Sequence, residues 1–68
     1  MPEELDSVEL VESVHGWPRG TAATVVDLPA EGYVTVEIDP ELQDPQAPLL
    51  DAVFDVPAAR VRVTARHG

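Results

Sequence analysis

YVTVEID, residues 33–39, alternates apolar and polar side chains more regularly than any other part of this chain. Its apolar residues Val34, Val36 and Ile38 recur at every second position, with a threonine and a glutamate between them. A period of two places alternate side chains on opposite faces of a half-buried strand. The stretch therefore predicts a strand with one face in a core and the other in water.

The same pattern recurs on both sides of this stretch. Seven prolines and four glycines cut the chain into short pieces rich in valine and threonine, which makes long helices improbable. Inward positions are expected at Val8 and Leu10, at Ala23 and Val25, and at Ala52, Phe54 and Val56. The predicted strands are residues 8–14, 21–28, 33–39, 50–56 and 61–63.

The connections complete an all-β architecture. They are predicted as a turn-rich loop at 15–20, a four-residue hairpin connection at 29–32, an exposed acidic loop at 40–48, a 3-10 turn at 57–60 and a frayed tail at 65–68. In the hairpin, Gly32 is free to adopt a positive φ. Five short strands joined in this way predict a small five-stranded SH3-like barrel, whose closure removes exposed edges.

Length bounds the domain organisation. A chain of 68 residues holds one core, so residues 1–68 are expected to form a single domain with an ordered part at about 5–64. There is no cysteine, and a domain this small then needs well-idealised packing or homo-oligomerisation for stability. No signal or membrane-spanning stretch is evident, so a cytoplasmic protein is expected.

The charge is strongly one-sided. Thirteen acids face four arginines and no lysine, for a formal charge of −9, so direct binding of nucleic acid by this chain is not expected. A basic protein partner is electrostatically easier. The alternative interpretation is that the acids only maintain solubility, as in a GC-rich genome or a high-salt cytoplasm.

Three of the arginines cluster near the C-terminus. Arg60, Arg62 and Arg66 have no acid among them, whereas residues 1–59 contain only Arg19. The first and last strands of a barrel are commonly neighbours, so Arg62 is expected to face Glu9 or Glu12 across that pair. We expect this structural role rather than an arginine patch for a ligand.

Catalytic and metal chemistry find little support in the residue types. The histidines His15 and His67 and the serines Ser7 and Ser13 form no nucleophile motif, so no catalytic residue is predicted and the chain is expected not to be an enzyme. Asp39, Glu41, Asp44 and Asp51 could suggest a calcium or magnesium site. Their loop has three prolines and no glycine for a tight turn, so neither a metal nor a cofactor is expected.

Trp17 is the main candidate for contact with a partner. A tryptophan in a loop between Gly16 and Pro18 can anchor an interface, because it buries a large area at low entropic cost. The alternative is that it covers the open end of the barrel above Val8 and Val61. The full set of predicted partner-binding residues is Trp17, Arg19, Tyr33, Glu41 and Asp44. Three aromatic residues are too few for a groove that binds proline-rich peptides.

With the strands placed, the chain resembles a small bacterial family of SH3-like barrels, known as domain of unknown function forty-nine twenty-six. The resemblance runs from Leu5 to Val63 and rests on the stretches DSVELVE at 6–12, GWPRGT at 16–21, ATVV at 23–26, YVTVEI at 33–38 and VP at 56–57. The chain departs from the family pattern at Ala23, where the family usually has glycine, and in a longer, more acidic segment at 40–48. The resemblance implies a neighbouring ribonuclease-like toxin, and hence an antitoxin or immunity role.

These observations predict a non-enzymatic protein-binding module that uses the Trp17 loop and residues 40–48 to cover a basic, ribonuclease-like partner. One alternative is a ribosome-associated barrel of the KOW type, in which residues 60–66 touch RNA. Another is an accessory subunit of a larger enzyme. Both alternatives rest on fold analogy.

Overall fold

Five antiparallel strands form a single sheet in the computed structural model, which describes residues 2–43 and 51–67. The strands are β1 (Ser7–Leu10), β2 (Ala22–Ala30), β3 (Tyr33–Ile38), β4 (Val53–Pro57) and β5 (Val61–Ala65), with the 3-10 turns η1 (Pro40–Leu42) and η2 (Ala58–Arg60). Their order across the sheet is β4-β3-β2-β1-β5. The predicted all-β class, the five strands and the 3-10 turn before the last strand are confirmed.

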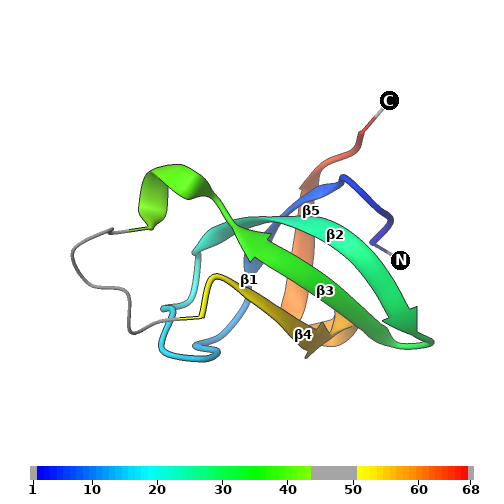
Figure 1. Cartoon of the computed structure of the whole chain (residues 1–68), viewed down its shortest axis with the longest axis horizontal. Helices are drawn as coiled ribbons and strands as arrows, with labels where there is room; N and C mark the ends of the chain where they lie inside the picture. The colour runs from blue at the N-terminus through cyan, green and yellow to red at the C-terminus, as the bar shows by residue number, and fades with distance from the viewer. Residues whose placement is uncertain (1, 44–50, 68) are drawn as a thin grey trace.

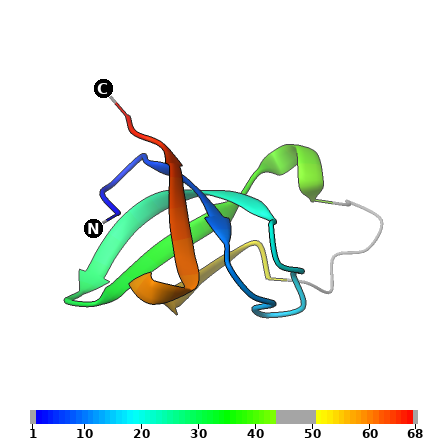
Figure 2. The same cartoon turned by 180° about the vertical axis from the view of Figure 1, so that it is seen from behind.

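The sheet bends so that its two ends lie on opposite sides of one core. β5 passes behind β2 and β3 in Figure 1 and in front of them in the reverse view of Figure 2. Every strand contributes buried side chains to this core. With Trp17, which comes from the loop before β2, the core residues are Val8, Leu10, Ala23, Val25, Val34, Val36, Ile38, Phe54, Val56 and Val61. Among the described residues, the edge strand β4 is paired with β3 alone, and the other edge strand, β5, is paired with β1 alone.

The alternation of β3 is confirmed in full. Val34, Val36 and Ile38 are completely buried, whereas Tyr33 and Glu37 are exposed. The predicted inward positions of the other strands are buried as well, except that Ala52 is half-buried. Alternate burial on paired strands fixes the register, because a slip of one residue would expose the whole apolar set.

β1 is shorter than predicted, since it ends at Leu10 and not at Val14. The chain leaves the β1–β2 ladder there, with the Val11 N–H donating to the Arg60 carbonyl at 3.0 Å. A tight turn at His15 and Gly16 follows. Val14 and Trp17 pair with each other across this turn, so Val14 does not continue β1 as predicted.

β2 is longer than predicted and the hairpin that follows it is shorter. Ala30 pairs with Tyr33, so the turn contains only Glu31 and Gly32, and not the four residues 29–32. The ladder to β3 shifts register twice, between Val25 and Asp27 and again before Ala30. Such bulges bend a strand and increase its twist, which suits a strand that runs along a curled sheet.

Gly32 has the positive φ of +80° that the hairpin requires. A Cβ at this position would meet no atom within 4 Å, so the cost of Gly32→Ala comes from backbone strain alone. We expect this variant to lose about 1 kcal/mol of unfolding free energy. Gly32→Asn is the control, because asparagine tolerates this conformation better than alanine. Chemical denaturation measures the unfolding free energy of both variants. Equal losses for Gly32→Ala and Gly32→Asn would contradict the role given to the positive φ of Gly32.

The predicted acidic loop at 40–48 is partly a 3-10 turn. Its first residues form η1, and the Gln43 side chain donates from Nε2 to the Ile38 carbonyl at 2.6 Å. β4 begins at Val53 and not at the predicted position 50. The rest of the predicted loop, including Asp44, and the predicted strand start at Leu50 lie outside the described residues.

A frayed tail was predicted at 65–68, but residues 65–67 are held in place, and Gly68 lies outside the described residues. β5 continues to Ala65, two residues beyond the predicted strand. Beyond it, the Arg66 side chain and the His67 backbone N–H both donate to the Asp6 carboxylate, at 2.9 and 3.1 Å. A buried carboxylate near the start of the chain therefore holds the residues that follow β5.

Candidate functional site

The predicted binding residue Trp17 belongs to the core. Only 8% of its surface is exposed, and it lies in the same buried cluster as Val8 and Val61. Its burial with Val8 and Val61 agrees with the alternative to the extent that the ring packs in the core. The ring contributes to folding, and little of it is accessible to a partner.

A two-residue turn directs Trp17 inward. His15 and Gly16 have φ values of +50° and +86°, which is typical of the type I′ turns in tight hairpins. Val14 and Trp17 exchange backbone hydrogen bonds of 3.0 and 2.8 Å across this turn. The indole Nε1 then donates to the Asp51 carbonyl at 2.6 Å, which ties the loop to the residues preceding β4.

The other predicted partner-binding residues do not form one site. Arg19 and Glu41 are exposed, in the loop before β2 and in η1 respectively. Tyr33 is 49% exposed and begins β3. In both views, the β2–β3 hairpin and η1 lie at opposite ends of the molecule (Figures 1 and 2). Asp44 is outside the described residues.

The structure instead brings acids together on the solvent face of β2, β3 and β4. Thr35 is paired with Asp27 on one side and with Asp55 on the other, and all three positions face away from the core. Glu37 follows two residues later on the same face of β3. We call Asp27, Glu37 and Asp55, with Tyr33 and Val53 beside them, the acidic face. All five of these side chains are exposed.

The strands that form the acidic face contribute no cation. Residues 20–59, which include β2, β3 and β4, contain no lysine, arginine or histidine. Two strand spacings separate Asp27 from Asp55, about 10 Å, and Glu37 lies diagonally from Asp55, at about 7–8 Å. The Thr35 hydroxyl donates to the Asp55 carboxylate, and the Leu28 backbone N–H donates to the Asp27 carboxylate at 2.9 Å, but both donors are uncharged. Like charges at these distances repel, so the face is arranged at some cost to stability.

Cations collect on the opposite part of the sheet, where acids hold them. Arg62 pairs with Glu9 across β1 and β5, as predicted, and Arg60 pairs with Glu12 at 2.5 Å. Arg66 pairs with Asp6 at 2.9 Å. Charge is therefore segregated: three ion pairs lie at β1, β5 and the residues next to them, whereas β2, β3 and β4 carry acids and no cation.

Asp6 is the most connected of the acids and lies outside the acidic face. Its side chain is 2% exposed, and it accepts hydrogen bonds from the backbone N–H groups of Glu3 and His67 as well as from Arg66. The Glu3 N–H bond lowers the pKa of Asp6 most, and His67 and Arg66 add to it. Together they outweigh burial, which raises the pKa, so Asp6 holds its charge.

Within residues 2–43 and 51–67, no three histidine, cysteine or acidic side chains come together as a metal site would require. In the same residues, no helix has the length and apolar character needed to cross a membrane. Neither a protein family model, nor a curated protein, nor a solved structure matches this chain.

Sequence reasoning identified the imbalance of charge and named Tyr33, but it missed the three acids of the acidic face. The absence of any cation from 20–59 was the available signal, and the alternation in β3 placed Glu37 outward. The juxtaposition of Asp27 with Asp55 depends on the bulge after Val25, because that bulge sets which residue of β2 faces Thr35. Nothing in the local sequence specifies that shift.

Proposed function

We propose that this chain is a non-enzymatic protein-binding module whose acidic face covers a basic protein partner. The observation that carries the proposal is the segregation of charge: β2, β3 and β4 carry acids and no cationic residue, while Arg60, Arg62 and Arg66 form ion pairs with acids on the far side. Repulsion within the acidic face favours a partner that supplies the missing positive charge.

The form of this function that fits best is an antitoxin or immunity protein. Carboxylates spaced over a sheet can occupy a cleft that binds the phosphates of a nucleic acid, so a basic ribonuclease is the partner we propose. We also propose that the sheet closes as an SH3-like barrel. Its support is the meander of β1 to β4 and the single turn η2, which returns the chain to place β5 beside β1.

The KOW-like and enzyme-accessory alternatives have no specific observation in their favour. The RNA-binding form would use the arginines at 60–66, and Arg60, Arg62 and Arg66 each face a carboxylate. A phosphate would have to displace Glu12, Glu9 or Asp6 to reach them. The proposal therefore concerns the acidic face alone.

The test is affinity capture from a lysate of the source organism at low salt, with quantitative mass spectrometry. The bait variant Glu37→Gln/Asp55→Asn removes two charges from the acidic face. Glu4→Gln/Asp51→Asn is the matched control, because it removes two exposed acids from elsewhere. We expect the first variant to retain about three- to tenfold less of a basic protein than the wild type, and the control to retain it fully.

The possible outcomes of this capture experiment separate the proposals. A basic ribonuclease that the chain also inhibits would support the antitoxin form. Equal retention by all three baits, or the absence of any basic protein among those retained, would overturn the proposal. Circular dichroism of the face variant guards against a folding artefact, because neutralising repelling acids should leave its unfolding free energy equal to or above that of the wild type.

A further inference from the structure

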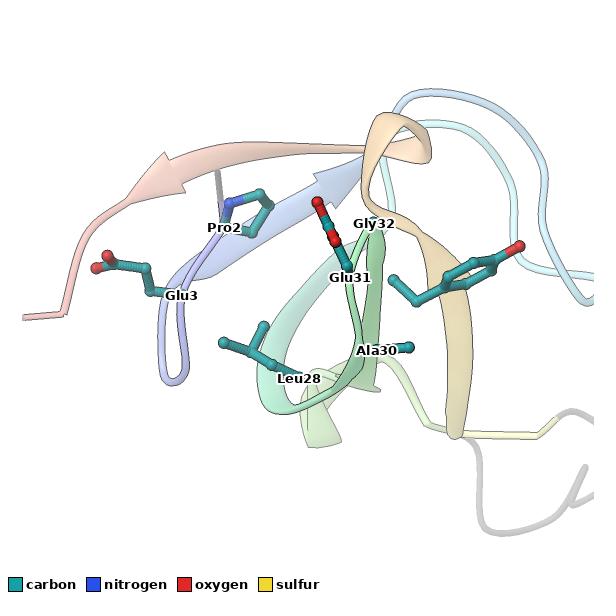
Figure 3. Close-up of a pocket in the computed structure, with 7 residues that line it drawn as sticks. Pro2, Glu3, Leu28, Ala30, Glu31 and Gly32 are labelled. Atoms are coloured by element: carbon teal, nitrogen blue, oxygen red, sulfur yellow. The ribbon is translucent and has the colours of Figure 1, made fainter.

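A groove of about 420 Å³ lies between the N-terminal segment and the β2–β3 hairpin. Its lining residues are Pro2, Glu3, Leu28, Ala30, Glu31, Gly32 and Tyr33, and none of them is basic. Figure 3 shows Pro2 and Glu3 on one side, Glu31 rising from the hairpin on the other, and Leu28 between them. An apolar floor is thus combined with the Glu31 carboxylate at the hairpin rim.

The N-terminal wall of the groove is fixed in place. The Leu5 N–H donates to the Val25 carbonyl at 2.7 Å, and the Glu3 N–H donates to the Asp6 carboxylate at 2.9 Å. Glu3 to Asp6 form a turn in which Leu5 has a φ of +69°, a region costly for a residue with a side chain. The fold keeps this conformation although the Leu5 side chain is 51% exposed, so burial of that side chain does not explain it.

The floor leaves apolar surface uncovered. Leu28 is 46% exposed although it lies in a strand, and Pro2 is half-buried beside it. The β1–β2 ladder covers only Ala22–Thr24 of β2. Near Leu28, the edge of β2 that faces away from β3 therefore has no neighbouring strand among the described residues. A ligand that fills this space needs an apolar body, and a positive end would meet the Glu31 carboxylate.

We propose that this groove receives a lysine or arginine side chain of a basic protein partner. The aliphatic stem lies over Leu28 and Pro2, and the cationic end meets Glu31, in the way that long basic side chains cover apolar surface while their charge stays in water. This inference rests on the proposed function and adds the position at which a partner residue inserts. Tyr33 belongs to both the groove and the acidic face, so one partner can cover both.

The test is an NMR titration of the full chain with N-acetyl-lysine-N-methylamide at low salt. We expect saturable shifts of the backbone amides of Leu28, Glu31 and Tyr33, with a dissociation constant in the millimolar range. The norleucine analogue has the same stem without the ammonium group, and it should bind at least threefold more weakly. Equal binding of the two compounds, or shifts confined to residues outside the groove, would overturn the proposal.

Two variants with the same change of charge locate the cation. Glu31→Gln should weaken binding about two- to fivefold, whereas Asp51→Asn, at an exposed position that does not line the groove, should leave it unchanged. If both variants weaken binding equally, the groove has no specific role. The titration uses no partner protein, so its failure leaves the capture experiment standing. Binding in the groove without a captured basic protein would contradict the proposed function alone.

Discussion

Replacing Trp17 by alanine is expected to lower the free energy of unfolding by about 3–5 kcal/mol. The ring is buried in the core, and its Nε1 is hydrogen-bonded to the Asp51 carbonyl, so the substitution leaves a cavity and releases the link to Asp51. A domain of this length has a total stability of roughly 3–10 kcal/mol. Much of the variant population should therefore be unfolded near physiological temperature.

Urea denaturation followed by circular dichroism measures this effect, because the variant lacks the only tryptophan and with it the usual fluorescence signal. Tyr33→Ala is the matched control: it also removes an aromatic ring, but one that is 49% exposed, and it should change stability by about 0.5 kcal/mol or less. Equal effects of the two variants would show that Trp17 is not the core residue described here.

Asp6→Ala is expected to lower the melting temperature by about 10 °C. The substitution leaves the Glu3 and His67 backbone N–H groups and the Arg66 guanidinium without the carboxylate that binds them. Both ends of the described chain lose an anchor at once. Asp55→Ala, which removes an exposed aspartate from the acidic face, is the control and should not destabilise to a similar extent.

The dependence of stability on pH gives a second test of the role of the Asp6 carboxylate. The folded-state pKa of Asp6 is lowered from 3.8, so its ionised form stabilises the fold fully above that value. The contribution is lost as the pH falls from 3.8 through the lower folded-state pKa. Asp6→Asn should remove this part of the acid dependence. Parallel stability curves for the wild type and Asp6→Asn between pH 7 and pH 2 would contradict the assignment.

The sequence allowed prediction of those strands whose alternation of apolar and polar residues is visible within a few positions. Alternation in residues 33–38 determines which side chains of β3 are buried, and the pairing of Glu9 with Arg62 followed from expecting the first and last strands to be neighbours. The ends of β1 and β2 could not be predicted, because they depend on contacts between distant segments. β2 continues through Pro29 because β1 does not extend beside it there, so an absent N–H donor costs no ladder bond.

The candidate site was harder to predict for the same reason. The sequence left Trp17 open between an interface anchor and a cover for the core, and the direction of the turn at His15 and Gly16 resolves its burial. Composition revealed the surplus of acids, whereas register decides which of them face one another. The Asp6 junction joins residues about sixty positions apart and has no local signature.

Segregated charge also affects how the molecule approaches a partner before any contact is made. With Arg60, Arg62 and Arg66 in or next to β5 and acids without any cation on β2, β3 and β4, the domain has an electric dipole as well as a net charge of −9. In the field of a positively charged protein it experiences a torque that turns the acidic strands forward. Productive collisions then become more frequent, and this acceleration of the association rate fades as salt shortens the range of the field.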